Sequence, residues 1–310
     1  MNKFKYTLDN KRYHTYNYFL KNRYHQKIAK VSLNGHFTCP NRDGTCGIGG
    51  CIFCSSLGSG DFAGNIKDDL FTQFDNVSQV MKRKWPECKF IAYFQANTNT
   101  YGTIEKLKRT FEPFINYPNV VGIAIATRPD CLNDEIVDYL YELSLKTDLY
   151  IELGLQTIHD STASFINRGH DYATFIEGLN KLRAKNLEVC VHIINGLPYE
   201  TKEMMLETAK TVGQLDIQAL KIHSLFILKD TKLNEIYQKE KFPLLSREEY
   251  IELVAEQLRY INENIVIERL TGDAPINDLV EPQWSIKKVT ILNDIDTLMK
   301  DKDIYQGDLI

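Results

Sequence analysis

The sequence predicts an α/β fold in which six parallel strands and their helices form a partial (β/α)6 barrel, preceded by a basic helical arm and followed by an α/β cap. Two observations predict the barrel. Short β-rich runs alternate with stretches of helical periodicity after residue 27, and polar clusters follow the ends of those runs. Barrel active sites are built where parallel strands end, so this placement predicts a functional rim.

The arm, residues 1–27, is basic and aromatic. Residues 1–30 contain eight Lys and Arg but only one acid, Asp9, whereas the whole chain has a formal net charge of −4. The same thirty residues hold five tyrosines and two phenylalanines. Cations bind phosphates and aromatic rings stack on unpaired bases, so the arm is a candidate RNA-binding segment. The alternative is a helix that covers the barrel floor, with its tyrosines partly in the core.

The barrel core is expected over residues 28–230. Its strands are predicted at 28–34, 90–95, 120–126, 150–156, 189–195 and 220–228. Helices are predicted between them near 67–84, 103–115, 133–146, 172–186 and 201–214. Asn133 is a predicted helix cap, and the acids that follow it suit the positive end of a helix.

Residues 231–310 are expected to form an extension that closes the barrel. The strand–helix alternation fades there into helices near 246–262 and 286–300 and a strand at 265–270. No apolar run approaches the ~20 residues that a membrane helix needs. Seven cysteines, four of them in one loop, are typical of a reducing compartment rather than of a secreted disulfide framework. We therefore expect a cytoplasmic protein with no membrane segment.

The loop after the first strand carries the most informative pattern, Cys39-x11-Cys51-x2-Cys54, with four glycines between the first two cysteines. Three thiolates can hold a [4Fe-4S] cluster and leave its fourth iron open to a ligand. Glycines let the backbone approach such a bulky group closely. Cys46 lies in the same loop, so a structural zinc site of four cysteines is an alternative. Polar clusters at the other strand ends favour catalysis, because a structural zinc site does not need them.

The loop, the strand order and the motifs at the strand ends resemble the radical S-adenosylmethionine (SAM) superfamily. Within it they are similar to the branch of oxygen-independent coproporphyrinogen oxidase and the Elongator catalytic subunit. The long first gap is similar to that of Elongator-like members, and Phe53 stands where the family has an aromatic residue. The resemblance implies a partial TIM-like barrel whose Cys39, Cys51 and Cys54 hold a [4Fe-4S] cluster, with Cys46 as an extra cysteine. It also implies reductive cleavage of SAM to a 5′-deoxyadenosyl radical, which abstracts hydrogen from carbon.

The resemblance also implies SAM contacts, residue by residue. The implied contacts are Asn97, Thr98, Gln156, Arg168 and His192. Gln156 belongs to the fourth-strand motif, residues 152–157, and is expected to reach SAM. Arg168, twelve residues on, is expected to pair with the SAM carboxylate. His192 stands where the porphyrin enzyme has an aspartate that contacts the ribose. Residues 196–198 are expected to line the adenine pocket.

No catalytic residue follows from the resemblance, and three side chains are candidates. Cys131, on the predicted rim, is a candidate hydrogen donor, although a cysteine there can also be a small apolar filler. Lys221 and His223 alternate along the sixth strand and are expected either near the substrate or satisfied within the core. Glu152 is expected to be a buried carboxylate with partners inside the barrel. Residues 269–275 resemble a C-terminal motif of the branch and are expected to close the barrel mouth.

The Elongator-like resemblance implies tRNA as the partner and the wobble uridine as the target. No stretch the size of an acetyltransferase domain follows the barrel, so we expect remodelling of an existing carboxymethylaminomethyl group at uridine C5. An electron donor such as flavodoxin or ferredoxin is also expected. Two alternatives remain: a radical SAM enzyme acting on a small molecule such as a tetrapyrrole, and a zinc-stapled RNA-binding module without catalysis.

Overall fold

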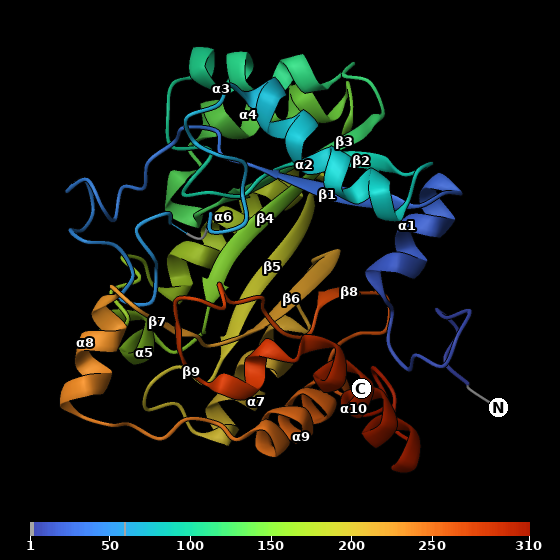
Figure 1. The fold of residues 1–310 in the computed structure, drawn as a ribbon, viewed down its shortest axis with the longest axis vertical. Coiled ribbons are helices and arrows are strands. Elements are labelled where there is room, and N and C mark those ends of the chain that lie inside the picture. The colour runs from blue at the N-terminus through green and yellow to red at the C-terminus, as the bar shows by residue number, and fades with distance from the viewer. Residues whose placement is uncertain (1–2, 59) are drawn as a thin grey trace.

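Seven parallel strands curl into an open half-barrel in the computed structural model, which describes residues 3–58 and 60–310 (Figure 1). The strands are β1 Ile28–Leu33, β2 Lys89–Phe94, β3 Val120–Thr127, β4 Asp148–Gln156, β5 Glu188–Asn195, β6 Ala219–Ser224 and β8 Val266–Arg269. They are hydrogen-bonded in the order β1-β2-β3-β4-β5-β6-β8. The predicted α/β partial barrel is confirmed. The strand expected within the C-terminal cap is the seventh strand of the same sheet.

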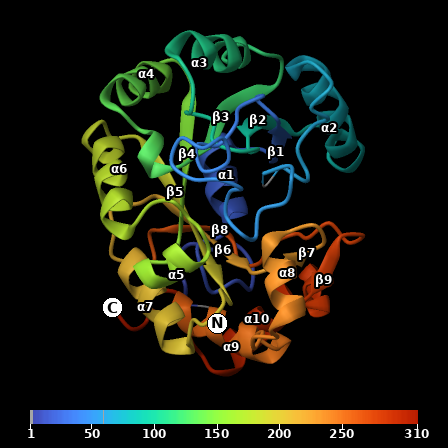
Figure 2. The ribbon, with the colours of Figure 1, turned by 90° about the vertical axis from the view of Figure 1, so that its left-hand side faces the viewer.

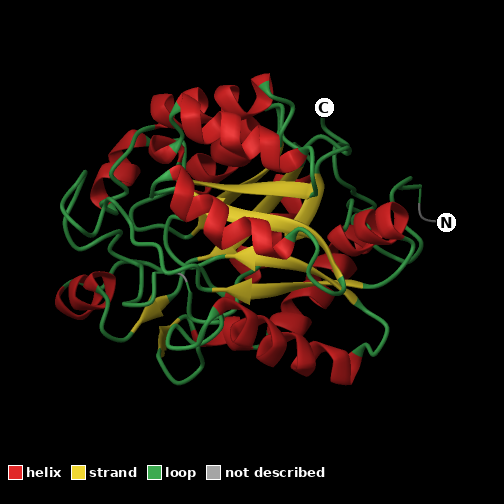
Figure 3. Cartoon of the chain, turned by 90° about the horizontal axis from the view of Figure 1, so that it is seen from above, coloured by secondary structure: helices red, strands yellow, loops and turns green. Residues whose placement is uncertain are grey.

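Helices cover the outside of the curl (Figures 2 and 3). The connecting helices are α2 Leu70–Lys84, α3 Ile104–Phe111, α4 Asp134–Ser144, α6 Tyr172–Ala184 and α7 Lys202–Val212, and the C-terminal ones are α9 Arg247–Leu258 and α10 Lys288–Asp301. Alternate strand residues such as Phe90, Phe94 and Ile151 are buried in the core beneath these helices. A side chain accepts a backbone N–H bond at the start of each connecting helix, as predicted for Asn133.

Three features of the fold differ from the prediction. The strand expected at 220–228 breaks after Ser224, and β7 Ile227–Leu228 pairs instead with β9 Leu279–Glu281. The helices α5 Asp160–Phe165 and α8 Lys232–Lys239 were not predicted. These elements are too short for a hydrophobic period to be recognised in the sequence. They all lie at the end of the barrel where the strands finish, so they shape the rim rather than the sheet.

The arm forms the floor of the barrel. Its helix α1 Tyr16–Tyr24 lies within the curl in Figure 2 and contacts both β1 and β8. Arg23 pairs with Asp148 at 2.7 Å and with Glu188 at 2.6 Å, and these two acids begin β4 and β5. The hydroxyl of Tyr24 donates to Asp148 at 2.6 Å. These contacts close the end of the barrel opposite the predicted rim.

Other cations of the arm are paired with the C-terminal part of the chain. Arg12 contacts Asp303 at 2.7 Å, Lys5 contacts Glu263 at 2.5 Å, and Lys11 pairs with Asp296. A phosphate would have to compete with these carboxylates for the same cations. The contacts therefore support the alternative prediction, a helix that covers the barrel floor, rather than an open RNA-binding arm.

A cluster of four charged side chains crosses the inside of the barrel. Lys30 on β1 contacts Glu152 on β4 and Glu268 on β8, each at 2.6 Å. Lys221 on β6 contacts Glu152 at 2.5 Å and Glu268 at 3.5 Å. Burial alone would raise the pKa of Glu152, but Lys221 and Lys30 outweigh that effect and hold the pKa well below its usual value. Two positive and two negative charges thus neutralise one another, and the expectation that Glu152 is buried with partners is confirmed.

Replacing Glu152 with glutamine should strongly destabilise the fold. The variant Glu152→Gln leaves the buried Lys221 and the half-buried Lys30 with Glu268 as their only carboxylate partner in the cluster. We expect a loss of about 3–5 kcal/mol of unfolding free energy, measured by urea denaturation. Glu263→Gln, which removes the exposed partner of Lys5, is the control and should leave the urea midpoint close to that of the parent. Equal midpoints for both variants would show that the cluster does not stabilise the fold.

Candidate active site

A cavity of about 270 Å³ opens at the carboxyl ends of the strands. The sequence-predicted residues that line it are Cys39, Cys51, Cys54, Asn97, Thr98, Gln156, Arg168, His192, Lys221 and His223. All three proposed cluster cysteines and all five implied SAM contacts therefore face one space. Cys46, Cys131 and residues 196–198 are not among its lining residues. The structure thus separates Cys46 from the other three cysteines of its loop.

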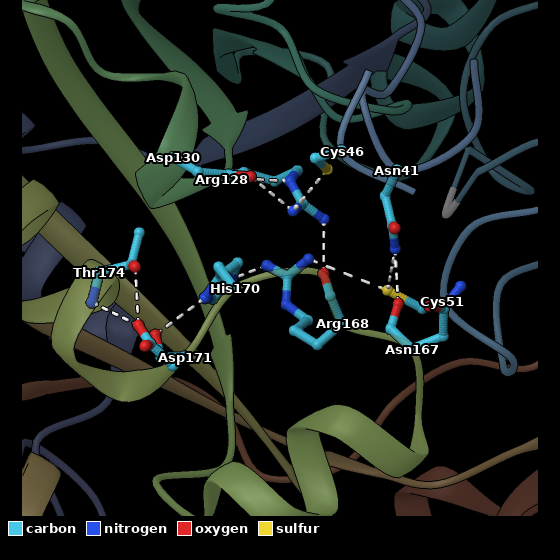
Figure 4. Close-up of polar contacts among 11 residues, drawn as sticks. Asn41, Cys46, Cys51, Arg128, Asp130, Asn167, Arg168, His170, Asp171 and Thr174 are labelled. Carbon is cyan, nitrogen blue, oxygen red and sulfur yellow. Dashed lines mark hydrogen bonds and ion pairs between the residues drawn. The ribbon is translucent and has the colours of Figure 1, made fainter. Parts of the chain in front are cut away.

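Two asparagines fasten the cysteine loop to the segment after α5 (Figure 4). The buried Asn41 donates from Nδ2 to the carbonyl of Asn167 at 2.5 Å and lies 3.7 Å from Cys51 Sγ. Asn167 donates back to the carbonyl of Gly50 at 2.7 Å. A Cβ on Gly47 would lie 2.1 Å from Asn41 Oδ1, so only glycine allows this close approach. This reciprocal contact could not be predicted from the sequence, because its two halves are more than a hundred residues apart.

The turn after β2 supports the two ends of the same loop. Asn97, at a φ of 61°, donates its backbone N–H to the carbonyl of Gly58 at 2.8 Å. The backbone N–H of Thr98 donates to the carbonyl of Thr38 at 3.2 Å. The turn therefore joins residues that precede and follow the cysteines. Asn97 and Thr98 lie on the cavity wall as a result.

Positive charge lies next to Cys51. The guanidinium of Arg168 is 3.9 Å from Cys51 Sγ. The pKa of the Cys51 thiol is lowered to about 5, first by a hydrogen bond from Cys54 and then by the charges of Arg168 and Arg128. The same hydrogen bond, together with burial, raises the pKa of Cys54. Cys51 is therefore favoured as a thiolate, the form in which cysteine binds iron.

Arg168 connects the cysteine loop to β4. Its Nη2 donates to the carbonyl of Gly154 at 2.7 Å, and its buried Nε has no hydrogen-bond partner within the described chain. A Cβ on Gly154 would lie 2.8 Å from Arg168 Nη2 and 3.1 Å from Gln156 Nε2. Gln156 itself has a φ of 81° at an irregularity in the pairing of β4 with β5. Glycine at 154 therefore lets both predicted SAM contacts lie close together.

Arg128 is a residue of this site to which the sequence analysis assigned no role. Its guanidinium donates to the carboxylate of Asp130 at 2.9 and 2.7 Å and to the carbonyl of Arg168 at 2.8 Å. It also lies 3.6 Å from Cys46 Sγ (Figure 4). The hydrogen bond from Arg128 to that carbonyl holds the backbone of Arg168 in place. The sequence feature that could have indicated this role is the pair Arg128 and Asp130, two residues apart just after β3.

Of the three catalytic candidates, Lys221 and His223 line the cavity and Cys131 does not. Cys131 is buried outside the cavity and burial raises its pKa, so its position matches the apolar-filler alternative rather than a hydrogen donor. Lys221 lines the cavity but is bound to Glu152. His192 Nε2 lies 3.0 Å from Glu152, and its ring centre is 5.3 Å from that of His223. The pKa values of both histidines are lowered, mainly by burial, so both are neutral near pH 7.

Family comparisons identify this arrangement. A family model of the radical SAM superfamily matches residues 39–212, and one of the radical SAM C-terminal domain matches residues 217–301. The chain belongs to the radical SAM superfamily. The predicted family is thus confirmed, and the reading of the cysteine loop as a zinc-stapled module without catalysis is wrong.

Several relatives resemble this radical SAM chain over half of its length or more. "Uncharacterized protein YtqA" of Bacillus subtilis is 51% identical over 99% of this chain and 95% of its own. Protein YhcC of Escherichia coli is 32% identical over 92% of this chain and 91% of its own. A tRNA uridine(34) acetyltransferase of Methanocaldococcus jannaschii is 24% identical over 52% of this chain and 30% of its own. The Methanocaldococcus infernus Elp3 structure shares the fold with a TM-score of 0.68 at 19% identity, over 91% of this chain and 64% of that one.

The protein is therefore a radical SAM enzyme that binds a [4Fe-4S] cluster and SAM. The site fits both groups, because three cysteines and a buried arginine with an unpartnered Nε face one cavity. Among residues 3–58 and 60–310, no three His, Cys or acidic side chains are grouped to hold a single metal ion. The thiolates of a cluster bind different irons, so they lie further apart than the ligands of one ion. No helix in the described chain is long and apolar enough to span a membrane.

Replacing the cysteines of the loop one at a time should distinguish the three cluster ligands from Cys46. Cys39→Ala, Cys51→Ala and Cys54→Ala should each lose most of the cluster iron after anaerobic reconstitution, because each removes one of three thiolates. Cys46→Ala should keep the iron and sulfide content of the parent, since Cys46 does not line the cavity. Iron and sulfide analysis with the visible spectrum measures this. Loss of iron in Cys46→Ala with retention in Cys39→Ala would overturn the assignment.

Adding one methyl group at Gly154 should weaken SAM binding. The new Cβ in Gly154→Ala would lie 2.8 Å from Arg168 Nη2, so the guanidinium must move. We expect the SAM dissociation constant of the cluster-loaded protein to rise about tenfold, which corresponds to ~1.4 kcal/mol. Gly102→Ala, away from the cavity, is the control. An unchanged dissociation constant in Gly154→Ala would exclude Arg168 as a SAM contact.

Proposed function

We propose that this radical SAM enzyme modifies the C5 side chain of the wobble uridine in tRNA, remodelling a carboxymethylaminomethyl group. The supporting observation is the similarity to tRNA uridine(34) acetyltransferases of two Methanocaldococcus species, each 24% identical over 52% of this chain. The match covers only 30% of each archaeal protein, so their acetyl transfer is not inferred for this chain. The shared part is consistent with a common target, uridine 34.

In this proposal the cavity residues divide into cluster ligands and SAM contacts. The ligands are Cys39, Cys51 and Cys54, and the SAM contacts are Asn97, Thr98, Gln156, Arg168 and His192. When bound, the cluster and SAM supply a 5′-deoxyadenosyl radical that abstracts a hydrogen atom from the substrate. Arg168, fixed by the carbonyl of Gly154 and with an unpartnered Nε, is suited to hold the SAM carboxylate. Neutral His192, close to Glu152, is suited to a polar but uncharged contact such as the ribose.

The proposed substrate suits this chemistry. A carboxymethylaminomethyl group contains a CH₂ between an amine nitrogen and a carboxylate, and a radical on such a carbon is stabilised by both neighbours. The cavity lies at the end of the barrel, where a base must be turned out of its stack to reach it. An anticodon base lies in an unpaired loop, so the cost of presenting it is small. An electron donor such as flavodoxin or ferredoxin completes the proposal.

The proposal is tested with anaerobically reconstituted protein, SAM and a reductant. Formation of 5′-deoxyadenosine should increase when bulk tRNA from a deletion strain is added, and the carboxymethylaminomethyl nucleoside should decrease in that tRNA by mass spectrometry. tRNA from the parent strain, already modified, is the control and should stimulate less. Identical wobble nucleosides in deletion and parent strains would contradict the tRNA substrate. Stimulation by a tetrapyrrole but not by tRNA would favour the small-molecule alternative.

A further inference from the structure

One cationic side chain that lines the cavity makes no hydrogen bond at all within the described chain. Five Arg and Lys side chains line the cavity: Arg42, Arg128, Arg168, Lys221 and Arg269. Arg42 donates to the carbonyls of residues 55 and 56, and Arg128 donates to Asp130. Arg168 donates to the carbonyl of Gly154, and Lys221 donates to Glu152. The guanidinium of Arg269 makes no hydrogen bond to any residue that the structure describes. Its ionic contact is with Asp273, at 3.4 Å from Nη2 to Oδ2.

The partner of Arg269 is already bound to another cation. Both carboxylate oxygens of Asp273 accept from Lys288 Nζ, at 3.0 and 2.8 Å. Arg269, Lys288 and Asp273 together carry one unbalanced positive charge, whereas the four-charge cluster below them is neutral. The pKa of Lys288 is lowered, first by burial and then by Arg269, as two cations sharing one acid require. Within this group of three side chains, one positive charge therefore has no acid of its own.

Two further side chains belong to this part of the wall. A Cβ on Gly272 would lie 2.5 Å from the ring of Phe226, so the backbone of β8's C-terminal loop is held directly against that ring. Phe226 lines the cavity and offers an aromatic surface to it. His223 also lines the cavity, and its Nε2 has no hydrogen-bond partner among the described residues. A guanidinium, an aromatic ring and a neutral imidazole thus share one wall.

Resting on the proposed function, we propose that Arg269 binds the carboxylate of the substrate side chain, with Phe226 as the contact surface for the base. A guanidinium remains charged and presents a planar fork of donors that matches a carboxylate. Aromatic rings accept a nucleobase without hydrogen-bond readout. Arg269 is then the residue that selects an acidic wobble side chain over an amine, because an ammonium group at the same place would meet a second positive charge.

The test combines a protein variant with a change in the substrate. Two tRNAs are compared, one with a carboxymethylaminomethyl side chain and one in which the carboxylate is replaced by its carboxamide. The parent enzyme should show a KM about ten- to a hundredfold higher for the carboxamide, the range of a charge-assisted hydrogen bond. Arg269→Gln should lose a similar factor on the carboxylate substrate and lose little more on the carboxamide. Arg269→Lys, which keeps the charge without the fork, should be intermediate.

Three controls separate the possible outcomes. Iron content, sulfide content and SAM binding are measured in Arg269→Gln, so that a loss of the cluster or of SAM is not taken for a loss of substrate recognition. The control Arg183→Gln, whose partner Asp216 lies on the surface, should resemble the parent. If Arg269→Gln does not take up a cluster, Arg269→Lys carries the test. A parent enzyme that is stimulated by tRNA but does not distinguish carboxylate from carboxamide contradicts this inference alone. A parent enzyme that no tRNA stimulates contradicts the proposed function as well.

Discussion

The open barrel depends on the four charged side chains that cross its interior. Lys30 belongs to the first strand of the sheet and Glu268 to the last, so their contact joins the two edges of the sheet across the curl. Burying single charges is costly, and the arrangement is stable only because each lysine meets both glutamates. The cavity lies directly above this neutral layer, and Lys221 belongs to both. The same four charged side chains therefore determine both the shape of the barrel and the neutral charge of the cavity floor.

The rim is held together by contacts between distant parts of the chain. Asn41 and Asn167 bind each other's backbone segments, and Arg168, adjacent to Asn167, lies between Cys51 and β4. A shift of either segment would move both the cysteine loop and the arginine proposed to hold SAM. The residues proposed to hold the cluster and those proposed to hold SAM are thus kept in place by the same few contacts. This coupling explains why glycine is needed at 47 and 154, where any side chain would separate them.

The charges of the cavity differ between its parts. Positive charge near Cys51 favours a thiolate, paired charges make the floor neutral, and Arg269 leaves one unbalanced positive charge on the rim. In the arm, by contrast, cations expected to be available for RNA are paired with acids of the barrel floor and of the C-terminal segment. Recognition of an acidic substrate is therefore better supported inside the cavity than along the arm.

The sequence by itself determined the features that depend on local pattern: the strand order, the caps of the connecting helices, the cysteine spacing and the family motifs. Only the tertiary structure decided which charged side chains are available to a ligand. Lys30 counted among the eight cations of residues 1–30 until its contacts with Glu152 and Glu268 placed its charge inside the barrel. Arg269 was one residue of a C-terminal motif until the structure showed that its partner Asp273 is already bound to Lys288. Ion pairs join residues far apart in the chain, and no local period records which partner a charge has found.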